Sequence, residues 1–192
     1  PEVYILIMPA FAITSEVIPV FSRKPIFGYP IMVAALVSIS FISLGVWAHH
    51  MFCVGMTSLE NAFFVTSTLL VSIPTGIKIF NWIATMYGGR LRFELPLIFA
   101  VGFLFQFLIA GLTGVMLAVA PFDWQLSDSY FVVAHFHYVL IGGLLFTIFS
   151  GIYYWYPKAF GRMPNFKLGL WHFVFFTIGF HMTFLPCLLY TS

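Results

Sequence analysis

Two histidines separated by one residue, His135 and His137, lie inside a long apolar stretch of this chain. Polar side chains within a membrane-spanning segment are costly, and those that occur there usually serve a function. Successive residues of an α-helix are turned by about 100°, so positions two apart point to nearly opposite faces. We therefore expect the two imidazoles to serve different centres on either side of one helix. Imidazole is a common ligand of heme iron, and the alternative is a pair of hydrogen-bonded histidines packed between helices.

A second pair, His49 and His50, follows Trp47-Ala48 at the end of another apolar run. Neutral imidazole suits copper, zinc and iron. Adjacent histidines at a helix end can reach one ion where the backbone bends. The alternative is an interfacial pair solvated by lipid headgroups, with Trp47 in the aromatic belt.

Lys78 lies within a third apolar run. An ammonium at the centre of a bilayer costs about 3 kcal/mol on insertion scales. The lysine either relays protons, with Thr75 holding a water one turn earlier on the same face, or extends its amine to the inner surface.

Glu2 and Tyr4 open the chain, also in apolar surroundings. A carboxylate at Glu2 is either an intramembrane proton carrier or a terminus artefact of truncation, and Tyr4 alone would be an interfacial anchor. His172 and His181 belong to no motif and are expected to be packing histidines.

The composition indicates a polytopic membrane protein. Of the 192 residues, 61% are hydrophobic and only 7% are charged, against about 25% charged in soluble domains. Six apolar segments each approach the roughly 20 residues that cross a bilayer: 1–20, 29–48, 60–86, 95–118, 129–156 and 168–190. Cys53 and Cys187 form no motif, and the chain begins without methionine or a signal peptide, so we expect an internal fragment.

The basic residues predict the orientation of these spans. Seven of the eight fall in three alternate connections, whereas the connections at 49–59 and 119–128 carry none. By the positive-inside rule, the basic connections face the cytoplasm or matrix. Both histidine pairs and Tyr4 are then expected in the outer half of the membrane, and Lys78 in the inner half.

Four motifs stand in the order and spacing of subunit I of the heme-copper terminal oxidases, which the chain resembles to about Pro186. They are Pro1-Glu2-Val3-Tyr4, Trp47-Ala48-His49-His50-Met51-Phe52, Ile73-Pro74-Thr75-Gly76-Ile77-Lys78 and Val133-Ala134-His135-Phe136-His137-Tyr138. The resemblance implies an all-α integral membrane protein that contributes six transmembrane helices to a bundle of about twelve. Residues 1–192 would form a partial subunit I domain, with parts missing at both ends.

The resemblance implies a metal ligand set. His49 and His50 would be two of the three ligands of a copper ion, CuB, and the third would be a histidine directly ahead of the first residue. His135 would bind the iron of a high-spin heme that faces CuB. His137 would bind a low-spin heme on the other face of the same helix.

The resemblance also implies roles in catalysis and proton transfer. Tyr4 would be the catalytic tyrosine, cross-linked to the missing histidine ligand. Glu2 would end one proton pathway. Ser15, Thr75 and Lys78 would line a second pathway that leads to Tyr4.

Two departures from the family pattern stand out. Asp128 is a candidate magnesium ligand, but Ser127 replaces the histidine that often precedes it. The segment from Cys187 to Ser192 leaves the family pattern altogether, which suggests truncation or a sequencing artefact.

The implied activity is reduction of dioxygen to water with electrons from cytochrome c, coupled to proton pumping. The implied cofactors are two hemes, expected to be of the heme A type, CuB and a magnesium ion. The implied partners are oxidase subunits II and III, cytochrome c, dioxygen and membrane lipids, with no nucleic acid. We expect a bacterial cytoplasmic membrane rather than a mitochondrial inner membrane, and an isolated fragment without activity.

Alternative functions share these residues. A quinol oxidase would use the same core, because the electron donor is selected largely by another subunit. A nitric oxide reductase fits less well, since Glu2, Tyr4 and Lys78 match the oxygen-reducing branch. A polytopic proton-coupled transporter would use the buried histidines and lysine without heme.

Overall fold

The computed structural model describes residues 2–190, which form helices and no strand. Pro1 of the first motif and Thr191 and Ser192 of the divergent end lie outside the described residues. The α-helices are α1 (Glu2–Ser22), α2 (Tyr29–Ile42), α3 (Ser58–Met86), α4 (Leu95–Leu117), α5 (Ala120–Leu126), α6 (Tyr130–His137), α7 (Phe146–Phe160) and α8 (Phe166–Leu189). Two short 3₁₀ turns, η1 (Ser43–Gly45) and η2 (Trp47–His50), follow α2, and a π-helix, η3 (Tyr138–Leu145), joins α6 to α7.

Five of the six predicted spans are helices long and apolar enough to cross a membrane. In lipid, a helix is favoured because it satisfies its own backbone polar groups. Helices α6 and α7 with η3 between them make one continuous span, Tyr130–Phe160. The stretch predicted at 29–48 differs, because α2 is only 14 residues long and the chain then tightens into η1 and η2.

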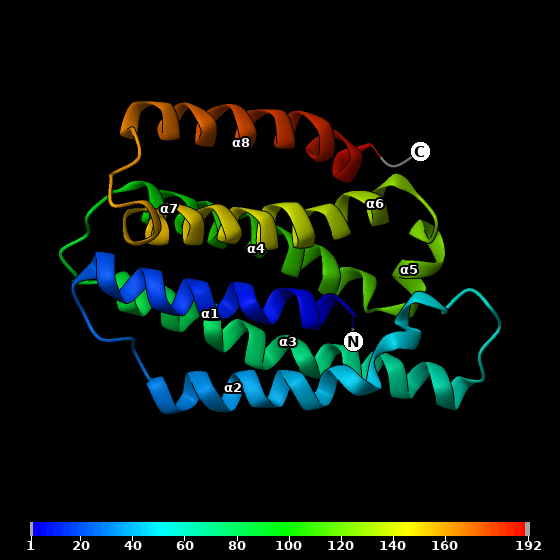
Figure 1. Ribbon diagram of the computed structural model, residues 1–192. Helices are drawn as coiled ribbons and strands as arrows, with labels where there is room; N and C mark the ends of the chain where they lie inside the picture. Colours follow the sequence, from blue (N-terminus) through cyan, green and yellow to red (C-terminus); the bar gives the residue numbers. More distant parts are fainter. Residues whose placement is uncertain (1, 191–192) are drawn as a thin grey trace.

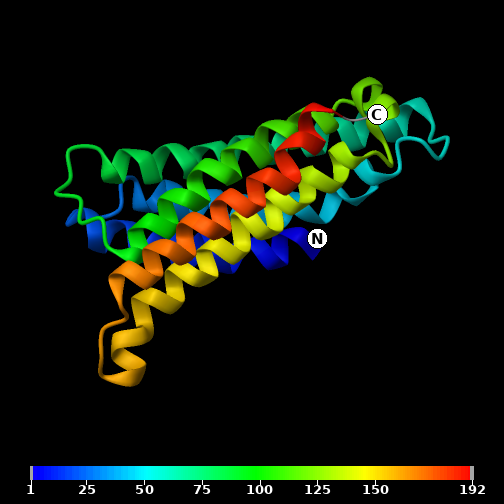
Figure 2. The same ribbon diagram turned by 90° about the horizontal axis from the view of Figure 1, so that it is seen from above.

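The long helices lie side by side and run in alternate directions (Figures 1 and 2). In Figure 1, α2 and α8 form opposite edges of the bundle, with α1, α3, α4 and α7 between them. The start of α1, the segment around residues 47–50, and α5 and α6 gather at one end. Both histidine pairs and Tyr4 therefore belong to elements at the same end of the bundle, as predicted; their depth in the membrane stays a prediction.

The basic connections gather at the opposite end of the bundle, after α1, α3 and α7 (Figure 1). Lys24 Nζ donates hydrogen bonds to the carbonyl oxygens of Ala84, at 3.2 Å, and Tyr87, at 2.6 Å. These carbonyls close α3, where a positive charge complements the helix dipole. The backbone N–H of Arg90 donates to the carbonyl of Ser22 at 3.0 Å, which joins two basic connections.

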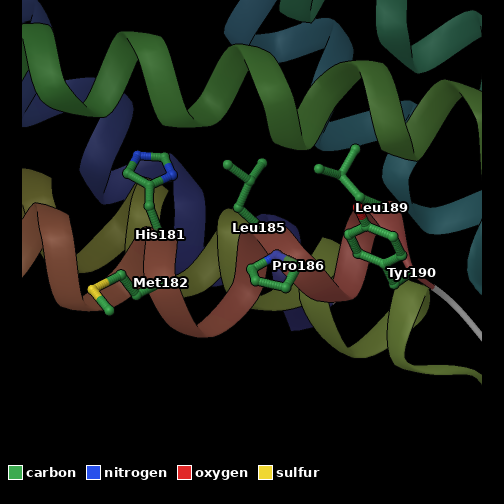
Figure 3. A pocket seen from close by; sticks show the side chains of 6 residues that line it. All are labelled: His181, Met182, Leu185, Pro186, Leu189 and Tyr190. Atoms are coloured by element: carbon green, nitrogen blue, oxygen red, sulfur yellow. The ribbon is translucent and has the colours of Figure 1, made fainter.

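Helix α8 buries only Gly169 and Phe180. Its outer end lines a groove of about 300 Å³, and His181 and Leu185 project from one side of the helix there (Figure 3). An apolar helix surface left open in this way is expected where a helix faces lipid or packs against further membrane helices.

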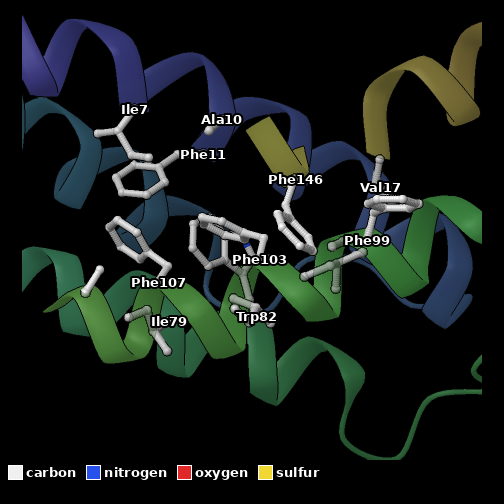
Figure 4. Close-up of a cluster of buried hydrophobic side chains, with 14 of the residues drawn as sticks. Ile7, Ala10, Phe11, Val17, Ile79, Trp82, Phe99, Phe103, Phe107 and Phe146 are labelled. Carbon is white, nitrogen blue, oxygen red and sulfur yellow. The ribbon is translucent and has the colours of Figure 1, made fainter. Parts of the chain in front are cut away.

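The centre of the bundle is an aromatic cluster shared by α1, α3 and α4 (Figure 4). Phe103 and Phe107 stack with ring centroids 5.3 Å apart. Phe11 meets the edge of Phe107 at 5.4 Å and tilts against Trp82, also at 5.4 Å. Offset and edge-on contacts of this kind contribute about 0.5–1.5 kcal/mol per pair beyond the area that they bury. The cluster fixes how α1, α3 and α4 are placed relative to one another.

Candidate metal-binding centre

The turn η2 brings the side chains of His49 and His50 together. Their Nε2 atoms lie 2.9 Å apart, and the two rings meet edge-on with centroids 4.2 Å apart. Two imidazole nitrogens therefore converge on one point, which is the arrangement needed for two ligands of a single ion.

A threonine on α3 determines which nitrogen of His49 carries the proton. The Thr68 hydroxyl lies 3.1 Å from His49 Nδ1 and 2.6 Å from the carbonyl oxygen of Phe64. A carbonyl can only accept, so Thr68 gives its single hydrogen to Phe64. His49 Nδ1 must then donate to Thr68, which leaves the lone pair on Nε2 for a metal.

His135 is held in the same way by α4. Its Nδ1 lies 3.0 Å from the hydroxyl of Thr113, which donates to the carbonyl oxygens of Ile109 and Ala110, each at 3.0 Å. The hydroxyl therefore accepts from Nδ1–H, and Nε2 of His135 keeps its lone pair.

The His135 ring lies directly against Gly114 of α4. A Cβ atom at Gly114 would stand 2.9 Å from Cε1 of the ring. No side chain fits there without moving the imidazole.

His137 points elsewhere. Its Nδ1 donates to the carbonyl oxygen of Val133 at 2.7 Å, and its ring stacks on Phe184 of α8 at 4.2 Å with an angle of 17°. His135 thus contacts α4, whereas His137 contacts α8. The prediction that the two histidines face different sides is confirmed, and Nε2 of His137 is again the nitrogen with a lone pair.

Lys78 is buried in the aromatic cluster, with 2% of its surface exposed. Its Nζ lies 5.5 Å from the centre of the Phe11 ring and 5.4 Å from that of the Trp82 ring. Figure 4 shows these two aromatic side chains. The Nζ atom also lies 3.5 Å from the carbonyl oxygen of Met32. Cation–π attraction can supply about 2 kcal/mol at a desolvated site. The interpretation that Lys78 extends to the inner surface is therefore wrong.

The predicted proton-pathway residues are partly brought together. Ser15 accepts a hydrogen bond from Nε1 of Trp82 at 3.1 Å, so Ser15 and Lys78 contact the same indole. Thr75 lies one turn before Lys78 and donates to the carbonyl oxygen of Val71 at 2.9 Å. Both hydroxyls are partly buried and retain an oxygen lone pair for water.

Tyr4 is partly buried in the first turn of α1 and packs against the central cluster. Glu2 is exposed at the start of the same helix. Asp128 is exposed with a φ of 62° in the connection between α5 and α6. Within residues 2–190, no three His, Cys, Asp or Glu side chains come close enough to hold one metal ion.

Three positions of the site were not predicted from the sequence. Thr68, Thr113 and Gly114 act on histidines that lie far away in the sequence. The only local signal is that each is small and lies on an apolar helix, which is not specific. A buried carboxylate, Asp123, was also missed; it is 7% exposed, and burial together with the nearby Asp128 raises its pKa.

The histidine donor set fits heme and copper. Metal-bound histidines almost always donate the second ring N–H to a carbonyl, carboxylate or water. In His49, His135 and His137, Nδ1 is engaged with a hydroxyl or carbonyl oxygen, and Nε2 is left as the ligand atom. The same pattern therefore occurs in both histidine motifs.

The chain matches the family described as Cytochrome C and Quinol oxidase polypeptide I over residues 1–190. It is 55% identical over 184 residues to cytochrome c oxidase subunit 1 of Alkalihalophilus pseudofirmus, covering 96% of this chain and 29% of that protein. It is 51% identical over 186 residues to quinol oxidase subunit 1 of Bacillus subtilis, covering 97% of this chain and 29% of that protein. It spans less than a third of the length of these curated relatives. The chain belongs to the heme-copper oxidase subunit I family.

Proposed function

We propose that the protein containing this chain reduces dioxygen to water, with electrons from cytochrome c, and couples the reaction to proton pumping. Family membership makes it an oxidoreductase of a respiratory membrane and removes the transporter alternative. The observation that carries the proposal is the presentation of Nε2 by His49, His135 and His137 at one end of the bundle.

Each histidine is assigned to a metal centre by what its side chain faces. His49 and His50 would bind CuB, because their Nε2 atoms converge. His135 would bind the high-spin heme beside CuB, since its ring faces α4 and α6 lies at the same end of the bundle as the segment around residues 47–50. His137, turned toward α8, would bind the low-spin heme. When bound, the hemes and copper supply the electrons that dioxygen takes up.

The protein side chains supply protons and hold geometry. Lys78 would carry protons from the inner end of the bundle toward Tyr4, because its flexible stem lies between α1 and α3 and its Nζ is buried. Ser15 and Thr75 would hold water along that route with their free lone pairs. Glu2 would deliver protons along a second route at the outer end of α1.

The phenol of Tyr4 can give up a proton together with an electron. Its place in the first turn of α1, at the end of the bundle where the histidines gather, supports a role in cleaving dioxygen. We therefore assign Tyr4 as the catalytic tyrosine.

The wider assembly follows from the same proposal. Residues 1–192 would be part of a bundle of about twelve transmembrane helices, of which they supply six if α2 with η1 crosses the membrane. Subunits II and III would complete the complex in a bacterial cytoplasmic membrane, with heme A and a magnesium ion near Asp128. A quinol oxidase is the second candidate, because a quinol oxidase subunit 1 is 51% identical to this chain.

The test uses the full-length protein in its purified complex. We expect dioxygen uptake with reduced cytochrome c, four electrons consumed per dioxygen, no peroxide released and acidification outside vesicles. Uptake with a quinol only would favour the second candidate. No uptake with either donor, in a complex with full heme content, would contradict the proposal.

A further inference from the structure

Tyr138 directly follows His137 and is anchored to α8. Its side chain has 0% of its surface exposed, and its hydroxyl lies 2.8 Å from Nδ1 of His181. The ring also meets Phe180 edge-on, with centroids 4.7 Å apart. A buried phenol needs a hydrogen-bond partner, and His181 supplies one inside an otherwise apolar interface.

The same face of α8 holds His137 itself. Phe184, one turn after His181, stacks on the His137 ring at 4.2 Å. His181 also neighbours Phe105 of α4, with ring centroids 6.2 Å apart. Helix α8 therefore contacts two consecutive residues: Phe184 stacks on His137, and His181 hydrogen-bonds Tyr138.

These two contacts with α8 lie where the backbone changes from α to π geometry. His137 is the last residue of α6, and Tyr138 is the first residue of η3. π-Helical segments are rare and are often found at functional sites. The α-turn that ends at His137 also places the Val133 carbonyl opposite Nδ1. A shift of the junction by one residue toward α6 would break that hydrogen bond and turn the imidazole.

We propose that His181 is a positioning residue for His137. By anchoring Tyr138, it fixes where the π-helix begins and thereby the orientation of the His137 ring. The proposal rests on the function proposed above, because it takes His137 as the ligand of the low-spin heme. His181 itself touches neither heme nor substrate in this role; it acts through Tyr138.

The experiment uses the full-length protein in its complex and reads the low-spin heme directly. We compare electron paramagnetic resonance g values and the reduced absorption band of that heme in Tyr138→Phe, His181→Phe and the double variant. Each single substitution should shift both signals in the same direction and by the same amount. The double variant should shift them no further, because both changes remove one hydrogen bond. His181→Asn, whose amide can still meet the hydroxyl, should move the signals back toward the wild type.

The chain offers a matched control pair. Tyr153 of α7 and His172 of α8 form the same kind of hydrogen bond, at 3.1 Å, away from the predicted heme ligands. Tyr153→Phe and His172→Phe should leave the low-spin signals unchanged.

Unshifted signals in the Tyr138 and His181 variants would overturn the inference, as would additive shifts or equal shifts in the control pair. Failure of the proposed function is separate and would appear in the wild type, as a complex without any low-spin heme signal.

Discussion

Gly114→Ala tests how closely α4 approaches His135. The added methyl carbon would lie 2.9 Å from Cε1 of the ring, whereas carbon atoms pack at about 3.5–4.0 Å. The imidazole must therefore retreat by about 0.6 Å or more. A retreat away from α4 also stretches the 3.0 Å bond to Thr113 to about 3.6 Å, a distance at which it ceases to be a hydrogen bond.

The expected cost follows from overpacking, at about 1–3 kcal/mol. If it falls on ligation, the affinity of the His135 site for heme drops about 5- to 150-fold. The assay is the carbon monoxide difference spectrum of the full-length complex, which reports the heme with an open position, normalised to the low-spin band. We expect Gly114→Ala to lose the carbon monoxide signal and to keep the low-spin band.

Gly111 provides the control, one turn earlier in α4, because a Cβ atom there meets nothing within 4 Å. Gly111→Ala gains about 1 kcal/mol of helix propensity and should keep both signals. A Gly114→Ala complex with the wild-type carbon monoxide spectrum would refute the reasoning about this contact.

Three further predictions concern other parts of the site. Thr68→Val removes the acceptor of His49 Nδ1–H and should lower copper affinity about 10–100-fold, measured as copper per complex during dialysis against a chelator, while Thr68→Ser should retain copper. Lys78→Met keeps an apolar stem among the aromatic rings but removes the amine, so heme content should stay normal while dioxygen uptake falls at least about tenfold, for a step that moves a proton; unchanged uptake would exclude the relay. Asp128→Asn removes a neighbouring negative charge and should lower the raised pKa of Asp123. The infrared band of the protonated Asp123 carboxyl is identified as the one that is lost in Asp123→Asn. The pH at which this band appears then reports the pKa with and without Asp128.

The sign of the Asp123 effect follows from linkage. A carboxyl whose pKa is raised in the folded state favours folding below its unfolded pKa, and that contribution is lost as pH rises through the folded pKa. Asp123→Asn should therefore stabilise the complex at neutral pH relative to the wild type and make no difference in acid. Thermal unfolding at the two pH values measures this difference, and equal melting temperatures at neutral pH would contradict it.

Much of the bundle could be predicted from the sequence because lipid leaves few choices. Apolar length gave the helices, and the basic residues gave the alternation that Figure 1 shows. The spacing of His135 and His137 was enough to predict opposite faces, since helical geometry is independent of neighbours. In the structure, His135 contacts α4 and His137 contacts α8.

Other features depend on contacts between distant residues and could not be predicted. The π-helix that begins at Tyr138 lies in a uniformly apolar run, where a period of 3.6 residues cannot be told from a longer one. Whether Lys78 is buried or reaches the membrane surface could not be predicted, because it depends on a contact with Phe11 of another helix. Thr68 and Thr113 gain their roles only when α3 and α4 pack beside the histidines.

The central claim is that His135 and His137 bind two different hemes. It is tested most directly by reduced-minus-oxidised and carbon monoxide difference spectra of the full-length protein in membranes, comparing the wild type with His135→Ala and His137→Ala. We predict that His135→Ala loses the carbon monoxide signal and retains the low-spin band, and that His137→Ala loses the low-spin band. Wild-type membranes without heme bands, or two variants that lose the same band and keep the other, would contradict the claim.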